Sequence, residues 1–230
     1  FQEIMNGDVS EAQIGAFLIA LRIRGEQVAD IAAAAAVMRE KAAKITASDA
    51  TIDIVGTGGD GVGTYNISTA SAFVVAGCGI PVAKHGNKAV SSQSGAADVL
   101  SALGIKLDCD FARVKQVLDE ANIAFLMAPR HHAAMRHVAP VRAALGVRTI
   151  FNMLGPLTNP ALVKRIMVGV YDRTYCAPFA YVLAELGTTH AWVVHGADGL
   201  DEVSTTGSTY VAELKNGTVT EFTISPENID

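Results

Sequence analysis

A glycine-rich segment is the strongest candidate for chemistry in this sequence. Residues 53–69 read Asp-Ile-Val-Gly-Thr-Gly-Gly-Asp-Gly-Val-Gly-Thr-Tyr-Asn-Ile-Ser-Thr, with glycines at positions 56, 58, 59, 61 and 63. Glycine lets successive backbone N–H groups approach an anion closely and surround it. Asn66, Ser68 and Thr69 follow, and such residues can hold an anion where a helix begins. A lone glycine loop is more often an ordinary turn, but this density of glycines before these polar residues favours a phosphate-binding loop.

Two common nucleotide-binding motifs fit this loop poorly. Gly56, Gly58 and Gly61 formally match the Gly-x-Gly-x-x-Gly pattern of dinucleotide-binding folds. However, the next helix is predicted to begin only near Ser68, and no acidic residue lies about twenty positions further on, where that motif needs one. The loop also lacks the Gly-Lys-Ser/Thr of a nucleoside-triphosphate-binding loop. We therefore expect a cradle for another kind of phosphorylated ligand.

A second polar loop follows the next predicted strand. Residues 84–95 read Lys-His-Gly-Asn-Lys-Ala-Val-Ser-Ser-Gln-Ser-Gly. In a parallel sheet both loops lie at the carboxyl edge of the strands, where ligands usually bind. Its two lysines supply positive charge, and Asn87, Ser91 and Ser92 supply neutral donors. Each lysine alone is typical of a solvated surface, but the pairing of the two loops suits a phosphorylated sugar.

An acidic loop follows a later predicted strand at 191–194. Residues 198–202 read Asp-Gly-Leu-Asp-Glu. Adjacent carboxylates repel one another unless solvent or a cation relieves them, and oxygen-rich loops suit Mg²⁺ bound together with substrate phosphates. Taken alone, this segment is better interpreted as an exposed acidic turn.

Basic residues gather in the segment before residues 149–160. They are His131, His132, Arg136, His137 and Arg142. An arginine fork pairs bidentately with a carboxylate, so one of these arginines could recognise an acid substrate. A zinc site is not expected, because no cysteine lies close and the histidine spacing matches no standard motif.

The composition is that of a globular protein able to bury a large core. The chain has 230 residues, of which 50% are hydrophobic and 18% charged, with a formal net charge of −5. This excludes intrinsic disorder and disfavours a generic basic protein that binds nucleic acid or a membrane surface.

The uncharged stretch 61–83 is interrupted by polar residues and Pro81, so no membrane span is predicted. No secretory signal is visible, and the missing initiator methionine leads us to expect a fragment.

Three cysteines, Cys78, Cys109 and Cys176, lie far apart without a Cys-x-x-Cys pair. This spacing fits a reducing cytoplasm better than a disulfide scaffold.

The elements that must position these loops follow from hydrophobic periodicity. Ser10 and Gln13 form a capping-box pattern before a helix that ends at Gly25, and a second helix with an alanine run covers 26–43. After a linker at 46–50, short strands alternate with helices, which predicts a largely parallel sheet in an α/β fold. Strands are expected at 51–55, 80–84, 105–107, 123–127, 166–170 and 191–194, and helices at 68–77, 95–103, 111–121 and 131–145, the last bent or broken by Pro140. Asn216-Gly217 predicts a terminal hairpin.

Taken together, these segments resemble the anthranilate phosphoribosyltransferase family of nucleoside-phosphorylase-like phosphoribosyltransferases. The resemblance covers essentially the whole chain, in order. It rests on Ala16-Phe-Leu-Ile-Ala-Leu-Arg-Ile-Arg-Gly25, Gly56-Thr-Gly-Gly-Asp60, Asn66-Ile-Ser-Thr69, Lys84-His-Gly-Asn87, Val141-Arg-Ala-Ala-Leu-Gly-Val-Arg-Thr-Ile-Phe-Asn152, Leu154-Gly-Pro-Leu-Thr-Asn-Pro160 and Asp198-Gly-Leu-Asp-Glu-Val-Ser204.

The resemblance implies an α/β fold in which a small α-helical domain is hinged to a larger α/β domain with a largely parallel central sheet. Residues 1–48, joined by helices from about 130–150, would form the helical domain and the homodimer contact, and 51–128 with 151–230 the α/β domain. The implied reaction transfers phosphoribose from 5-phosphoribosyl 1-diphosphate to anthranilate with Mg²⁺, in cytoplasmic tryptophan biosynthesis. Family members extend beyond both ends of this chain, and neither nucleic acid nor a membrane is an expected partner.

The resemblance also implies roles for individual residues. The phosphoribosyl donor would be held by Gly56, Gly59, Asp60, Thr64, Asn66, Ile67, Ser68, Thr69, Lys84, His85, Gly86, Asn87, Lys88, Ala89, Val90, Ser91, Ser92 and Ala96. Anthranilate would contact Gly56, Asn87 and Arg142, with His85, His132 and Pro156 also on the acceptor side. Mg²⁺ would be held by Ser68, Asp201 and Glu202. The chain departs from the family at Lys88, Ala96 and Ala133, where arginine, serine and proline are usual.

The sequence leaves two other functions open. A pyrimidine nucleoside phosphorylase of the same architecture would use phosphate and a nucleoside, although residues 84–87 and 154–160 favour the anthranilate enzyme. A non-catalytic homologue could bind nucleic acid in the same cleft, although the acidic charge balance speaks against it.

Overall fold

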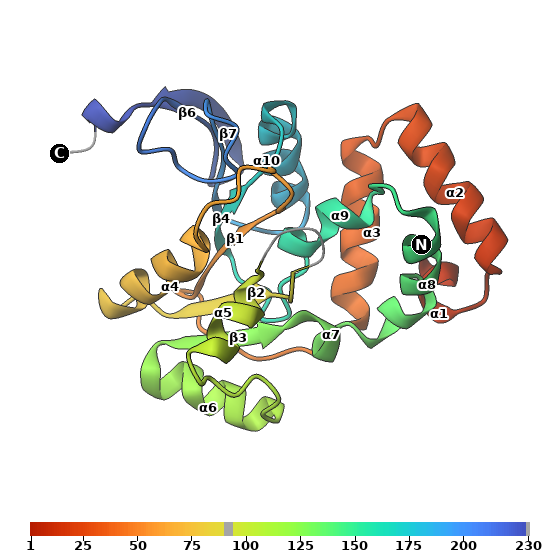
Figure 1. Ribbon diagram of the computed structural model, residues 1–230, viewed down its shortest axis with the longest axis horizontal. Helices are drawn as coiled ribbons and strands as arrows, with labels where there is room; N and C mark the ends of the chain where they lie inside the picture. Colours follow the sequence, from red (N-terminus) through yellow and green to blue (C-terminus); the bar gives the residue numbers. More distant parts are fainter. Residues whose placement is uncertain (90–93, 229–230) are drawn as a thin grey trace.

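The computed structural model describes residues 1–89 and 94–228 as a helical layer packed beside a seven-stranded sheet (Figure 1). The strands are β1 (Ile52–Gly56), β2 (Val82–Gly86), β3 (Ile123–Met127), β4 (Arg165–Gly169), β5 (His190–Gly196), β6 (Thr209–Lys215) and β7 (Thr218–Ile224). The helices are α1 (Gln2–Asn6), α2 (Glu11–Arg24), α3 (Val28–Lys41), α4 (Ile67–Gly77), α5 (Ala96–Ala102), α6 (Phe111–Ala121), α7 (Ala128–His131), α8 (Ala139–Leu145), α9 (Phe151–Leu154) and α10 (Cys176–Glu185).

The sheet has the strand order β3-β2-β1-β4-β5-β6-β7. The five strands from β3 to β5 are parallel, and β6 and β7 add an antiparallel hairpin that turns at Asn216-Gly217. Both turn residues have positive φ, as a tight hairpin requires. The predicted largely parallel α/β sheet and its terminal hairpin are therefore confirmed.

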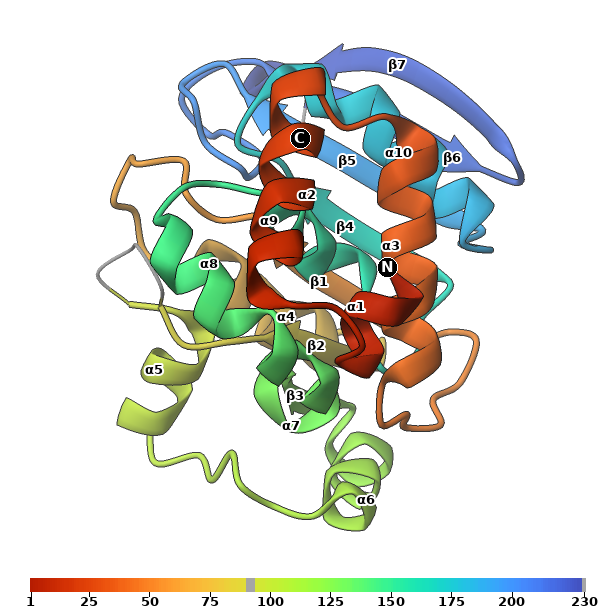
Figure 2. The same ribbon diagram turned by 90° about the vertical axis from the view of Figure 1, so that its right-hand side faces the viewer.

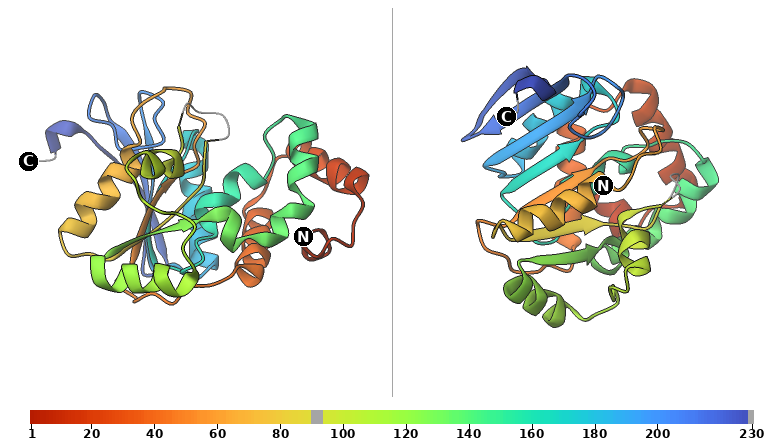
Figure 3. Two further views of the ribbon diagram at one scale, coloured as in Figure 1. Left: turned by 60° about the horizontal axis from the view of Figure 1, so that its bottom comes forward. Right: turned by 60° about the vertical axis from the view of Figure 1, so that its left-hand side comes forward.

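Helices cover the two faces of the sheet unequally (Figure 3). The buried residues Val168 and Val193 share one core with α10, which also packs on α3. The opposite face carries α4, whose Ala72 and Ala76 pack on Val82. Because α4 begins directly after the glycine loop, its packing on β1 and β2 holds the loop over the carboxyl edge of these strands.

The N-terminal helices pack against later helices of the chain (Figure 2). Ser10 and Gln13 form the predicted capping box at the start of α2. Ile14 of α2 and Ile31 of α3 share one apolar core with Val141 of α8. The alanines of the run in α3 that are buried lie in this same core, so the run packs within the chain.

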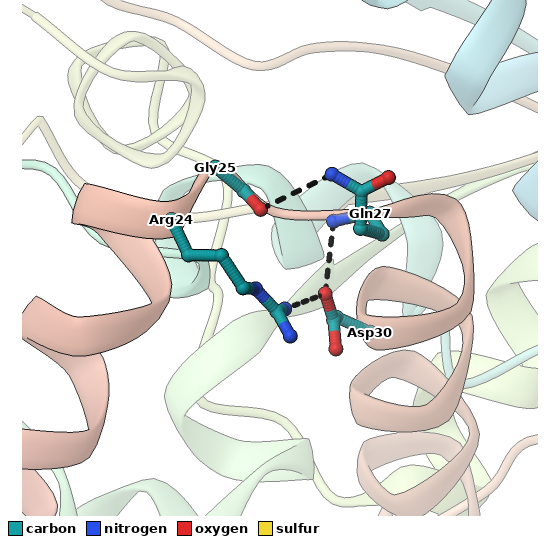
Figure 4. Close-up of polar contacts among 4 residues, drawn as sticks. All are labelled: Arg24, Gly25, Gln27 and Asp30. Carbon is teal, nitrogen blue, oxygen red and sulfur yellow. Dashed lines mark hydrogen bonds and ion pairs between the residues drawn. The ribbon is translucent and has the colours of Figure 1, made fainter.

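The corner between α2 and α3 is closed by polar contacts (Figure 4). Asp30 accepts a hydrogen bond from the Gln27 backbone N–H at 2.9 Å and pairs with Arg24. The Gln27 amide donates to the Gly25 carbonyl at 3.4 Å. These contacts satisfy groups that the ends of two helices leave unpaired.

One prediction of secondary structure is wrong, and a second is confirmed only in part. Residues 105–107 form no strand: they follow Gly104, which has a φ of +84°, and the strand beside β2 is β3. The expected helix at 131–145 is broken, as predicted, into the last residue of α7, a 3₁₀ turn at Ala133–His137 and α8, but the break does not lie at Pro140. The break precedes Pro140, which lies in the first turn of α8, where the missing N–H of proline costs nothing.

Within residues 1–89 and 94–228, no helix combines the length and apolar character needed to cross a membrane.

Candidate active site

Three loops that are distant in sequence meet at the carboxyl edge of the parallel strands. Glu202, after β5, accepts a hydrogen bond from the Ser68 backbone N–H at 3.1 Å. Lys84 of β2 donates to the Ser68 hydroxyl at 3.1 Å. Asp201 accepts from the Gly58 backbone N–H at 2.7 Å. The glycine loop, β2 and the acidic loop therefore share one rim, as expected from the order of strands in a parallel sheet.

Close backbone approach explains two glycines of this rim. A Cβ on Gly56 would lie 2.4 Å from the Asp201 carboxylate, and one on Gly169 of β4 would lie 1.4 Å from the Asp201 backbone oxygen. Side chains at these positions would exclude the acidic loop from its place across β1 and β4. Gly58 and Gly59 have φ values of +68° and +76°, which residues with a side chain rarely adopt.

Lys84 is a buried cation between two acids. Its side chain is 3% exposed, and its ammonium donates to the Ile54 carbonyl at 2.7 Å as well as to Ser68. Burial lowers the pKa of Lys84, while the charges of Asp53 and Glu202 oppose that change. The ammonium is thus held at the N-terminus of α4, where an anion is also favoured.

Asp201 and Glu202 are adjacent acidic side chains that are partly removed from water. Burial raises the pKa of both side chains, that of Glu202 to about 7, and the Asp201 charge adds to the rise at Glu202. A bound divalent ion would relieve this repulsion, and the hydroxyl of Ser68 adds a third oxygen donor. Within the described residues, no group of three histidine, cysteine or acidic side chains is placed to hold a metal. The oxygen donors here therefore suit Mg²⁺ that shares its coordination with substrate phosphates and water.

The loop predicted to bind phosphate after β2 is held at both of its described ends. Asp98 accepts from the Ala89 and Gly95 backbone N–H groups, each at 2.8 Å. Ala96 lies beside Gly86, where an added Cβ would be 3.4 Å from the Ala96 methyl group. The predicted donor residues Val90, Ser91 and Ser92 lie outside the described residues.

Other predicted donor residues differ in exposure. Asn66 is half-buried and donates to the Ser94 hydroxyl at 3.1 Å. Asn87 accepts from the Lys88 backbone N–H at 2.8 Å, and both residues are exposed. The remaining members span the range from exposed to buried: Asp60 and Ile67 are half-buried, Thr64 is exposed and Thr69 is buried.

Two residues predicted for the acceptor side, His85 and His132, are buried histidines in contact with each other. His85 and His132 approach each other through their Nε2 atoms at 3.2 Å, and His85 Nδ1 lies 3.2 Å from the Gly155 carbonyl oxygen. Burial lowers the pKa of His85 to about 3 and that of His132 to about 4, so both rings are neutral at pH 7. Pro156 is also buried, directly after the carbonyl that His85 contacts.

Arg142 is placed on α8 as a half-buried cation. Its guanidinium carbon lies 5.7 Å from the centre of the Phe151 ring, and burial lowers its pKa. In the part of the chain that the structure describes, its guanidinium has no hydrogen bond or ion pair, so it is not joined directly to Gly56 or Asn87. An unpaired, partly desolvated guanidinium is suited to an acidic ligand.

Sequence reasoning missed three residues of the rim and its support. Arg148 donates to the Gly59 carbonyl at 2.5 Å and lies 4.0 Å above the centre of the Tyr171 ring. Asp53 and Asn159 are fully buried beneath Lys84 and His85. An acidic residue inside an apolar strand was a signal for Asp53, whereas Arg148 and Asn159 had no local signal.

Comparisons with known proteins agree with this arrangement. A model described as the glycosyl transferase family a/b domain matches residues 48–230, and one described as its helical bundle domain matches residues 1–42. The chain is 61% identical to an anthranilate phosphoribosyltransferase of Azospirillum brasilense over 99% of its own length and 63% of the relative. It is 60% identical to that of Paramagnetospirillum magneticum, over 100% of its own length and 66% of the relative. The chain thus spans slightly less than two thirds of the length of these relatives.

Solved structures show the same similarity. Anthranilate phosphoribosyltransferase from Thermus thermophilus superposes with a TM-score of 0.92 at 46% identity, covering 99% of this chain and 68% of that one. The Saccharomyces cerevisiae enzyme in complex with PRPP and Mg superposes with a TM-score of 0.85 at 34% identity, covering 94% of this chain and 61% of that one.

Proposed function

Because the chain belongs to the glycosyl transferase family that combines a helical bundle with an α/β domain, we propose that it transfers phosphoribose from 5-phosphoribosyl 1-diphosphate to anthranilate. The products are N-(5-phosphoribosyl)anthranilate and diphosphate, within tryptophan biosynthesis. The observation that carries this proposal is the chain of contacts from Lys84 through Ser68 to Glu202. It unites an anion-binding helix start, a buried cation and an acidic pair at one rim.

In the reaction, the bond from the anomeric carbon to diphosphate breaks and a bond to the anthranilate nitrogen forms. The diphosphate leaves with the electron pair, and the amine loses one proton. Positive charge develops on the ribosyl ring, so the protein acts mainly by positioning and electrostatics. The backbone amides of the glycine loop and the Lys84 ammonium would bind the phosphates of the donor.

Ser68, Asp201 and Glu202 would hold Mg²⁺. When Mg²⁺ is bound, it would neutralise negative charge on the diphosphate group. The raised pKa values of both acidic side chains support this role, because a carboxylate desolvated without a cation is costly.

On the acceptor side, Arg142 would pair with the anthranilate carboxylate. Its partial burial and its lack of an ionic partner among the described residues support this assignment. The neutral rings of His85 and His132 could carry the released proton, and a strong base is unnecessary because the amine already attacks as the neutral species.

The proposal extends to organisation and location. Residues 1–48 with the helices at about 130–150 would form one domain, and 51–128 with 151–230 the other. Packing of α2 against α8 supports this division, since a Cβ on Gly15 would lie 3.7 Å from Val141. Exposed Ile23 on α2 supports dimerisation through the helices, and the three unpaired cysteines support a cytoplasmic location.

The test follows anthranilate fluorescence in the full natural chain, with and without phosphoribosyl diphosphate and Mg²⁺. We expect consumption only when both are present, and loss of the Mg²⁺ dependence in an Asp201→Asn/Glu202→Gln variant. The matched control is Asp119→Asn/Glu120→Gln, which neutralises a second adjacent acidic pair on the exposed face of α6. Full Mg²⁺-stimulated turnover in the first variant would reject the metal assignment, and phosphorolysis of thymidine or uridine would indicate a nucleoside phosphorylase.

A further inference from the structure

The hydrogen-bonded ladder between β1 and β2 is interrupted after its first pair. Ile52 pairs with Val82, and no further backbone pair joins these two strands. By contrast, β1 pairs with β4 continuously from Ile52 to Gly56. The β2–β3 ladder is also complete, so the interruption is confined to the junction that carries the two phosphate loops.

Three side chains take the place of the missing backbone pairs. With Ile52 opposite Val82, a continuous parallel ladder would pair Ile54 with the Ala83 carbonyl and the His85 N–H. Instead, the His85 N–H donates to Asp53 Oδ1 at 3.2 Å, and Asn159 Nδ2 donates to the Ala83 carbonyl at 2.7 Å. The Ile54 carbonyl accepts the Lys84 ammonium at 2.7 Å.

Asp53 and Asn159 also bind each other. Asn159 Nδ2 donates to Asp53 Oδ2 at 2.8 Å, and Asn159 Oδ1 accepts from the Ala161 N–H at 2.7 Å. These contacts assign the orientation of the amide. Both side chains are buried, with exposed fractions of 0% for Asp53 and 1% for Asn159. A buried acid and amide that satisfy one another so fully form a specific connection between strand and loop.

This connection joins both substrate sides of the candidate site. Asp53 is the buried counter-charge of Lys84 on the donor side. Asn159 belongs to the segment that begins at Gly155, whose carbonyl contacts His85 on the acceptor side. Burial raises the pKa of Asp53 to about 6, although Lys84, Asn159 and backbone N–H groups oppose this rise. The carboxylate is therefore mostly ionised at pH 7, and its desolvation costs free energy of folding.

We propose that Asp53 and Asn159 are positioning residues that hold β1 and β2 apart at Ile54 and thereby set Lys84 against Ser68 and His85 against Gly155. This inference rests on the proposed function, because it takes the two loops to bind the phosphates of the donor. Asp53 and Asn159 would set the spacing of these loops without touching either substrate. A pair serving stability alone would leave ligand affinity unchanged in every variant that folds.

The chemistry of the pair offers an exchange test. Asp53→Asn places an amide against the Asn159 amide, and Asn159→Asp places two carboxylates together. In the double variant Asp53→Asn/Asn159→Asp, the new amide at position 53 can accept from His85 and donate to the new carboxylate at position 159, which can still accept from Ala161. The exchange preserves net charge, but it replaces the donor to Ala83 by a carboxylate oxygen that faces the Ala83 carbonyl.

The experiment measures binding of inorganic diphosphate with Mg²⁺ by calorimetry, and kcat and KM for both substrates, in the full natural chain. We expect each single variant to weaken diphosphate binding and lower kcat/KM for the phosphoribosyl donor at least tenfold. The exchange variant should recover at least tenfold over Asn159→Asp. Asp49→Asn, an exposed charge loss, is the control and should behave as wild type. Unfolding by urea identifies variants that fail to fold.

Each outcome is decisive. A folded Asp53→Asn with wild-type diphosphate affinity, or a folded exchange variant no better than the single variants, overturns the proposal. So does failure of all three variants to fold, because the pair would then serve stability alone. If only the exchange variant folds, an affinity within tenfold of wild type supports the proposal and weaker binding overturns it. Wild-type protein that binds diphosphate without consuming anthranilate would reject the proposed function only. Wild-type protein that neither binds diphosphate nor consumes anthranilate would reject both the proposed function and the positioning role of Asp53 and Asn159.

Discussion

Gly56 and Asp201 approach so closely that a Cβ on Gly56 would lie 2.4 Å from Asp201 Oδ2. The φ of Gly56 is not positive, so this contact is the main obstacle to a side chain there. The same carboxylate oxygen accepts a hydrogen bond from the Gly58 N–H and would have to move. The acidic loop is therefore seated on the backbone of β1.

We predict that Gly56→Ala lowers kcat/KM for the phosphoribosyl donor about 10- to 150-fold, because it displaces Asp201 from a charge-assisted hydrogen bond of about 1.5–3 kcal/mol. Steady-state kinetics over a range of Mg²⁺ concentrations would measure this. Gly77→Ala is the matched control, since a Cβ there meets nothing within 4 Å. Equal loss in both variants would show that the Asp201 contact is irrelevant.

Arg142→Ala should impair use of anthranilate far more than use of the donor. Loss of a partly desolvated guanidinium–carboxylate pair costs about 2–3 kcal/mol, equivalent to a roughly 30- to 150-fold fall in kcat/KM for anthranilate. Kinetics with each substrate varied in turn would measure it. Arg136→Ala removes an arginine from the neighbouring turn and should have little effect. An unchanged anthranilate KM and kcat/KM in Arg142→Ala would remove its assigned role.

His85 and His132 should make the fold sensitive to acid. Both have folded pKa values depressed by burial, to about 3 and about 4, below the usual value near 6.5. Their contribution to stability is therefore present above pH 6.5 and is lost as the pH falls toward the folded values. Between about pH 7.5 and 5.5 we expect them together to remove about 2–3 kcal/mol from the free energy of unfolding.

Urea unfolding of wild type and of a His85→Gln/His132→Gln variant would isolate this contribution, since the raised pKa values of Asp53 and Glu202 act in the opposite direction in both proteins. The variant should lose less stability on acidification. The same pH dependence in both proteins would contradict neutral buried rings.

Arg39 should stabilise the packing of α3 against the rest of the chain. Its guanidinium donates to the Leu157 carbonyl at 2.6 Å and the Leu186 carbonyl at 3.0 Å, and burial lowers its pKa to about 10. Arg39→Ala leaves both carbonyls without this donor, so we expect a loss of about 2–3 kcal/mol in unfolding free energy. Arg24→Ala, which breaks only an exposed ion pair, should cost less than about 1 kcal/mol. Comparable urea midpoints for the two variants would argue against the role of Arg39.

Local patterns in the chain were enough to predict elements whose stability comes from near neighbours. The capping box of Ser10 and Gln13 predicts the start of α2, and Asn216-Gly217 predicts the β6–β7 turn, because both depend on contacts a few residues apart. The alternation of apolar strands and helices likewise predicted a parallel sheet with its polar loops at one edge. The same patterns failed at residues 105–107, which form no strand, and they misplaced the break in the helix at 131–145, which lies before its proline.

Contacts between distant residues were decided only by tertiary structure. Asp53 and Asn159 are separated by 106 positions, and Gly58 and Asp201 by 143, so no local periodicity indicates that they meet. Burial then changes what these groups do: water would favour charged carboxylates and partly protonated histidines, whereas the folded interior raises the pKa of Glu202 and lowers that of His85. The types of residue in the site could therefore be predicted from the sequence. Their spacing and partners arise from packing in the folded protein, and their protonation arises from desolvation.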